Sequence, residues 1–124
     1  MTPWPNYEVV YYQDAKGNHP AKDFLEHLPE KVQGKFLKWI LLLEEKGPYL
    51  TRPYADILRD KIRELRVGFG SDQYRFLYFF HGKVAVLTHG FVKKTDQVPD
   101  EEIERAVRRM NDFLIRIERG EVEL

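Results

Sequence analysis

Basic side chains gather in the middle third of the sequence, where aromatic residues are interleaved with them. Residues 61–95 carry 7 Lys and Arg against 2 Asp and Glu, whereas residues 1–60 carry 8 against 9 and residues 96–124 carry 5 against 9. The 124-residue chain has a net charge of zero, so the asymmetry is local. Because local potential rather than total charge attracts phosphate, the central segment indicates a polyanionic partner.

Several side chains of this block are of types that bind nucleic acid. Guanidinium and ammonium groups offset phosphate charge, and an exposed ring can stack on a base, which is how single-stranded RNA is usually bound. The candidates for these contacts are Lys61, Arg63, Arg66, Arg75, Phe91, Lys93 and Lys94. Gly90, beside Phe91, permits close approach of another group to the backbone.

Two residues near the block could transfer protons. His89 is a candidate because histidine titrates close to neutrality, and Glu64 because a carboxylate among cations stays ionised. Each also has a structural interpretation: Glu64 could pair with Arg66, and His89 could be a partly buried strand residue. The pair Lys93-Lys94 could equally be a solvated loop.

Other chemistries are excluded by the residues present. The chain has no cysteine, so it has no disulfide, no thiolate nucleophile and no Cys-based metal site. His19 and His27 lack metal-ligand spacing, and no phosphate-binding loop, dinucleotide fingerprint or serine elbow occurs. We expect no metal and no cofactor.

Composition and the N-terminal sequence bear on location. A chain with 43% hydrophobic and 32% charged residues is neither disordered nor a membrane protein. The segment after Met1 lacks the basic flank and apolar run of a signal peptide. We therefore expect a cytoplasmic protein without a membrane partner.

The elements that must position the candidate residues follow from periodicity. Residues 7–12, rich in β-branched and aromatic side chains, predict a strand. Proline at 20 and at 29 suits the first position of a helix, which predicts a short helix at 20–28 and a longer one at 30–46. Segment 48–60 has no clear period, and no structure is predicted for it.

From residue 61 the side-chain pattern has a period of two, which predicts three antiparallel strands, at 61–67, 74–80 and 83–92. Hairpin turns are expected to join them. A last helix is expected to begin after Pro99, with acidic residues in its first turn, and to end at Gly120. Alternation places Lys61, Arg63, Leu65 and Val67 on one side of the first of these strands and Ile62, Glu64 and Arg66 on the other. In the next strand it separates Arg75, Leu77 and Phe79 from Tyr74, Phe76, Tyr78 and Phe80.

The order of elements predicts one α+β domain over residues 1–124: an N-terminal strand, two helices, a three-strand meander and a C-terminal helix. Because each helix has one apolar stripe, we expect the helices to pack on one face of a small antiparallel sheet. The other face would then be free for partners.

Three motifs in a fixed order resemble a known family. They are Lys61-Ile-Arg-Glu-Leu-Arg66, Tyr74-Arg-Phe-Leu-Tyr-Phe79 and His89-Gly-Phe-Val-Lys-Lys-Thr95, followed by the closing helix after Pro99. Over residues 7 to about 117 the chain resembles the HigB-like, phage-derived branch of the RelE/ParE toxin superfamily. The resemblance implies a RelE-like fold and the toxin of a type II toxin–antitoxin system.

The resemblance further implies metal-independent cleavage of mRNA on the ribosome and inhibition by a HigA-like helix-turn-helix antitoxin, an acidic or amphipathic part of which would cover the basic surface. It gives most weight to Arg75 and to the basic residues after the last strand. RelE-type members have paired lysines near 61–67 and a C-terminal tyrosine, but here Glu64 interrupts the basic series and residues 100–124 contain no tyrosine. A RelE mechanism is therefore not transferable, and two alternatives stay open: a ParE-like gyrase poison and a non-catalytic RNA- or protein-binding module.

Overall fold

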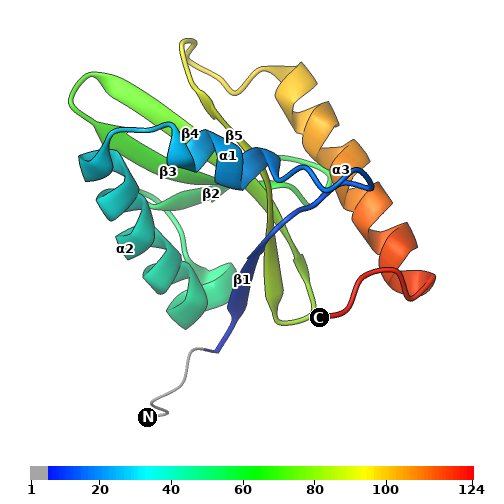
Figure 1. Ribbon diagram of the computed structural model, residues 1–124. Coiled ribbons are helices and arrows are strands. Elements are labelled where there is room, and N and C mark those ends of the chain that lie inside the picture. The colour runs from blue at the N-terminus through cyan, green and yellow to red at the C-terminus, as the bar shows by residue number, and fades with distance from the viewer. Residues whose placement is uncertain (1–5) are drawn as a thin grey trace.

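A five-stranded sheet lies between helices in the computed structural model, which describes residues 6–124 (Figure 1). The elements are β1 (Glu8–Tyr11), α1 (Pro20–Glu26), α2 (Glu30–Lys46), a 3₁₀ turn (Gly47–Tyr49), β2 (Ala55–Ile57), β3 (Arg63–Phe69), β4 (Asp72–His81), β5 (Val84–Val92) and α3 (Asp100–Glu118). Residues 1–5, on which part of the signal-peptide prediction falls, lie outside the described residues.

The sheet has the strand order β1-β5-β4-β3-β2. Strands β2 to β5 pair antiparallel with their neighbours, whereas β1 pairs parallel to β5. The α+β class, the order of elements and the meander are thus confirmed. Strand β2 is an addition, because its three residues are too few to show a period in the sequence.

The prediction that all helices pack on one face of the sheet is wrong. Helices α1 and α2 cover one face, whereas α3 covers the other (Figure 1). The reason lies in β4, which is apolar on both sides: Phe76 and Tyr78 face α1 and α2, and Leu77 and Phe79 face α3. A strand buried on both faces needs a helix layer on each.

Helix α3 is fixed to its face by an apolar stripe and by polar contacts with the end of β1. Its buried residues are Ile103, Ala106, Met110 and Phe113. The hydroxyl of Tyr12 donates a hydrogen bond to Asp112 Oδ2 at 2.6 Å. Burial and this hydrogen bond raise the pKa of Tyr12 to about 12. The face that was expected to be free for partners is therefore partly covered, because α3 packs on β4 and β5.

Helices α1 and α2 press closely against the strands that carry the basic residues. A Cβ at Gly90 would lie 2.4 Å from Cδ2 of Phe24, so glycine lets the α1 ring rest on β5. On α2, Trp39 Nε1 donates to the carbonyl oxygen of Arg66 at 2.8 Å, and Lys35 Nζ donates to that of Gly68. These bonds hold β3 in place from the face opposite to α3.

Candidate functional site

A cleft of about 330 Å³ opens between β2, β3 and the segment that links β5 to α3. Its lining is Arg52, Asp56, Leu58, Arg59, Glu64, Arg66, Lys93, Asp96, Gln97, Val98 and Ile103. Three of the predicted site residues, Glu64, Arg66 and Lys93, thus lie together. The cleft has four cationic side chains around it, which favours an anionic ligand.

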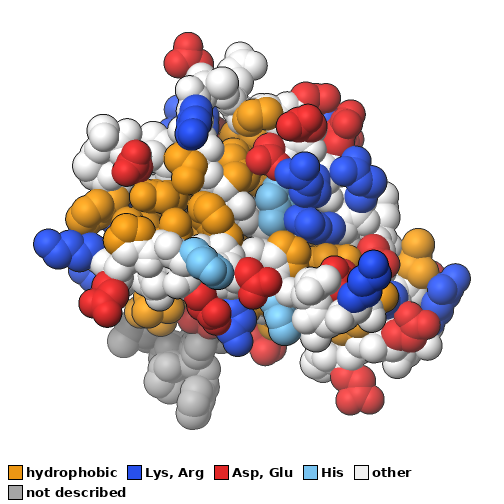
Figure 2. All heavy atoms as spheres, turned by 45° about the horizontal axis from the view of Figure 1, so that its top comes forward, with side chains coloured by type: hydrophobic (Ala, Val, Ile, Leu, Met, Phe, Trp, Pro, Cys, Tyr) orange, Lys and Arg blue, Asp and Glu red, His pale blue; other side chains and the backbone are white. Residues whose placement is uncertain are grey.

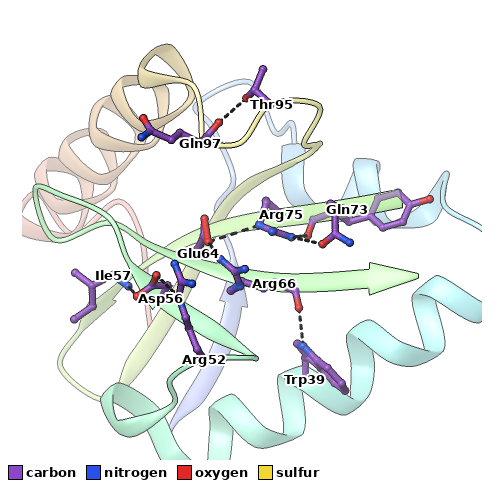
Figure 3. Close-up of polar contacts among 11 residues, drawn as sticks. Trp39, Arg52, Asp56, Ile57, Glu64, Arg66, Gln73, Arg75, Thr95 and Gln97 are labelled. Atoms are coloured by element: carbon purple, nitrogen blue, oxygen red, sulfur yellow. Dashed lines mark hydrogen bonds and ion pairs between the residues drawn. The ribbon is translucent and has the colours of Figure 1, made fainter. Parts of the chain in front are cut away.

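Glu64 joins two guanidinium groups at the back of the cleft (Figure 3). Arg66 and Arg75 lie directly opposite each other on β3 and β4, so their like charges repel. Glu64 Oε1 lies 2.7 Å from Nη1 of Arg66 and 3.6 Å from Nε of Arg75. The predicted pairing of Glu64 with Arg66 is therefore present, and the carboxylate offsets the repulsion between the two arginines.

Arg75, the foremost sequence candidate, is buried behind Glu64 and does not line the cleft. Its Nη1 donates to the carbonyl oxygen of Tyr74 at 3.0 Å and to Oε1 of Gln73 at 3.3 Å. Burial lowers the pKa of Arg75, and Glu64 acts in the opposite direction. An arginine so placed keeps its charge and acts on the cleft through Glu64.

Arg66 is the guanidinium that reaches the cleft from this group, with 24% of its side chain exposed. Among the other lining cations, Arg52 Nε donates to Asp56 Oδ2 at 2.8 Å, and Arg59 pairs with Asp60 and Asp100. No ion pair is present for Lys93 among residues 6–124. Lys93 has no carboxylate to pair with here, and Arg66 shares its carboxylate with Arg75, so these two cations have the least compensated charge at the cleft.

The remaining predicted residues lie outside the cleft. Arg63 is on the other face of the sheet, as alternation predicts, where its guanidinium donates to the carbonyl of Pro48 at 3.0 Å and lies over the ring of Phe80. Lys61 is exposed in the turn before β3, and Lys94 is exposed after β5. The structure does not bring these three residues together with Arg66.

His89 and Phe91 lie beneath the beginning of α3, with their ring centres 5.9 Å apart. Nε2 of His89 is 3.3 Å from Glu102 Oε1, and Nδ1 is 3.0 Å from the hydroxyl of Thr88. A neutral ring with its proton on Nε2 donates to Glu102, and the single proton of the Thr88 hydroxyl is shared between Nδ1 of His89 and the carbonyl oxygen of Leu77, 3.2 Å away.

His89 is a candidate for proton transfer only if its ring gains and loses a proton near neutral pH, and the folded chain does not allow this. Burial, together with the nearby charges of Arg109 and Arg105, lowers the pKa of His89 to about 3. The argument that His89 titrates close to neutrality therefore fails. At pH 7 the ring is uncharged and a weak base. Its burial matches the structural interpretation, and its partners are the side chains of Thr88 and Glu102.

Sequence reasoning missed the contribution of the segment before β3. Arg52, Asp56 and Arg59 line one wall of the cleft, and they come from residues 48–60, for which no structure was predicted. The only signal in the sequence is the presence of two arginines and two carboxylates in that segment, which does not indicate their positions.

The part of the chain that the structure describes holds neither a metal-binding cluster nor a membrane-spanning helix. No group of three or more His, Asp or Glu side chains is arranged to hold a metal ion. None of the helices in this part of the chain is long and apolar enough to cross a membrane.

Residues 23–111 match the family of phage-derived Gp49-like proteins (DUF891). The match covers more than half of the sequence, and the chain therefore belongs to this family. The family is RelE-like and is associated with the toxins of toxin–antitoxin systems, so that membership implies an antitoxin partner. A search of curated proteins found no match to the chain.

Proposed function

We propose that this chain is a HigB-like toxin of a type II toxin–antitoxin system, which cleaves mRNA on the ribosome, in the cytoplasm, without a metal ion. The observation that supports the proposal most is the cleft lined by Arg66 and Lys93. Membership of a toxin-associated family supports the proposal of a toxin independently of the cleft. The target and the chemistry are inferences from these two facts.

The reaction that suits such a cleft uses the RNA's own 2′-hydroxyl. A bond forms from the 2′-oxygen to the neighbouring phosphorus while the bond to the 5′-oxygen breaks, which leaves a 2′,3′-cyclic phosphate and a 5′-hydroxyl. A base takes the 2′-proton and an acid gives one to the 5′-oxygen. Negative charge grows on the phosphorane oxygens, where Arg66 and Lys93 stabilise it.

Glu64 and Arg75 have a supporting role in this proposal. Glu64 holds the guanidinium of Arg66 at 2.7 Å, which limits its motion before RNA binds. Arg75 lies 3.6 Å from the same carboxylate oxygen and holds it from the buried side. Both are positioning residues, since neither Arg75 nor most of Glu64 is exposed to a ligand. A part for Glu64 in proton transfer stays a prediction.

The antitoxin that the family implies is proposed to be a HigA-like helix-turn-helix protein. The wall of the cleft carries several cations, so an acidic or amphipathic segment of that protein would complement it. Such a segment would block the cleft and compete with RNA for the same charges.

The proposal is tested by expressing the chain in bacteria without antitoxin. We expect growth arrest with cleaved transcripts. Arg66→Ala should reduce cleavage by roughly 10²–10³-fold, as is usual when one donor to a developing oxyanion is removed. Lys31→Ala, which changes an exposed lysine of α2, is the matched control and should arrest growth as the wild type does.

The alternatives give different results in the same cultures. DNA damage signalling with intact transcripts would replace the proposal with a gyrase poison. Normal growth with intact transcripts would leave a binding module, whose RNA binding falls as salt is added but which cleaves nothing.

A further inference from the structure

Three arginines gather on the first half of α3, apart from the cleft. Arg105, Arg108 and Arg109 have the three- and four-residue spacing that puts side chains on one side of a helix. Figure 2 shows Lys and Arg side chains gathered beside a histidine in this region. Arg105 and Arg109 both lower the pKa of the buried His89, which places them close to that ring. We call these three residues the α3 arginine cluster.

Within residues 6–124 one ion pair is present for the cluster, between Arg105 and Glu102. Glu102 Oε1 accepts a hydrogen bond from Arg105 and also contacts His89, so this oxygen has little capacity to accept a further hydrogen bond. Arg109 has no hydrogen bond or ion pair from its side chain within residues 6–124, although it is half-buried. Burial and the charge of Arg105 lower the pKa of Arg109, as does the charge of Arg108, whereas Tyr12 and Asp14 act in the opposite direction. An arginine that is partly desolvated and repelled by its neighbours favours binding of an anion.

The cluster and the cleft lie along one row of the sheet. Phe91 on β5 is opposite Arg75 on β4, and Arg75 is opposite Arg66 on β3. Adjacent strands are about 4.8 Å apart, so Phe91 is about 10 Å from the position of Arg66 along the row. Phe91 is partly exposed and its ring lies against His89, beneath the arginines. A strand bound at Arg66 would therefore meet a ring next and the cluster after it.

We propose that the α3 arginine cluster binds a backbone phosphate of the same RNA strand, a few nucleotides from the bond that is cut, with Phe91 stacking a base between them. The inference rests on the proposed function, since it takes RNA as the ligand of the cleft. An acidic protein segment would also suit the guanidinium groups. RNA is favoured because a partly exposed ring alternates with cations along the row, as in sites for single strands.

The test measures binding of a 2′-O-methyl single-stranded RNA, which cannot be cleaved, by fluorescence anisotropy over a range of salt concentrations. Arg109→Ala should weaken binding by about three- to tenfold and reduce the slope of log K against log salt by about 0.7, the value for one phosphate contact in a single strand. Arg109→Lys should restore most of the slope because it keeps the charge. Arg119→Ala removes an exposed arginine just after α3 and is the matched control.

Folding is checked by thermal unfolding. Because Arg109 has no partner in the free protein, Arg109→Ala should unfold at the same temperature as the wild type or higher. A variant that unfolds at a lower temperature and loses binding in proportion would overturn the inference, because the arginine would then have a structural role.

The outcomes separate this inference from the proposed function. If Arg66→Ala weakens RNA binding and Arg109→Ala behaves as Arg119→Ala does, the α3 cluster is not an RNA site, while the cleft stands. If the wild-type protein shows no salt-dependent RNA binding, the proposed function fails first. If Arg109→Ala weakens binding of the antitoxin and leaves RNA binding unchanged, the cluster is a protein interface and the inference is overturned.

Discussion

At the scale of single residues, the cleft depends on a carboxylate shared by two arginines. Glu64 and Arg75 are almost completely buried, and Arg66 joins them from the exposed side. The sequence predicts the face that these side chains share, because alternation puts Glu64 and Arg66 together. It does not predict that Arg75 is buried, since that depends on what α3 and its linking segment cover.

Glu64→Gln should destabilise the fold. The substitution removes the carboxylate nearest to Arg75 and leaves a buried positive charge uncompensated. Breaking one side of a buried ion pair costs about 3–5 kcal/mol, and we expect a loss near the lower end because Arg75 keeps two hydrogen bonds to oxygen. Urea unfolding measures it. Glu104→Gln, at an exposed position of α3, should change the free energy of unfolding by less than about 0.5 kcal/mol. Equal effects of the two substitutions would contradict this account.

His89 should make the stability depend on pH below neutrality. Its pKa is about 3 in the folded chain, against an ordinary value of 6.5. Between these values the unfolded state binds more protons, so the free energy of unfolding rises with pH, by up to about 1.4 kcal/mol per unit. The stabilisation is complete above about pH 6.5 and is lost as the pH falls toward 3.

The variant His89→Gln should show a shallower dependence in urea unfolding between pH 4 and 6.5, because it removes the titrating ring. The exposed His27 supplies the control, and His27→Gln should retain the wild-type slope. Should all three proteins lose stability in parallel, burial of His89 would not be the cause of the acid sensitivity.

At the scale of elements, the sequence predicts which helices exist better than where they pack. The apolar stripe of α3 shows that the helix is buried on one side, but a stripe does not state which face of the sheet it covers. The information was present in β4, where apolar residues run without interruption from Phe76 to Phe80. Such a run is typical of a strand buried on both faces, and it overrides the alternating pattern of a strand with one free face.

Segment 48–60, in contrast to β4, has no sequence pattern from which its structure could be predicted. It supplies β2 and one wall of the cleft, yet three strand residues and two prolines show no period. The positions of Arg52 and Arg59 are set by pairing of β2 with β3 and by the turns on either side, which only the folded chain specifies.

Two glycines should respond in opposite ways to alanine. At Gly90 the new Cβ would lie 2.4 Å from the Phe24 ring and 3.0 Å from that of Phe76, so α1 must shift. We expect Gly90→Ala to cost about 1–3 kcal/mol. At Gly34, within α2, no atom lies within 4 Å, and Gly34→Ala should add about 0.5–1 kcal/mol through helix propensity. Chemical denaturation of both variants measures this, and the same sign for both would contradict the packing described for α1.

At the scale of the whole molecule, a chain without net charge presents strongly charged regions. The basic central block is divided by the sheet: Arg66 and Arg75 lie on the α3 side, whereas Arg63 lies on the other. The acidic C-terminal third contributes Glu102 and also the arginines of the α3 cluster. Total charge therefore conceals the surface that a phosphate chain or an acidic antitoxin would meet.

The most direct test of the central claim is cleavage of a defined mRNA by the purified protein in a translation extract, mapped by primer extension. We predict cuts that appear only while ribosomes translate the message, with a 5′-hydroxyl on the downstream fragment, and that are lost with Arg66→Ala and retained with Lys31→Ala. An intact message after incubation with the wild-type protein, or equal cutting by Arg66→Ala, would contradict the claim that this cleft is a ribonuclease site.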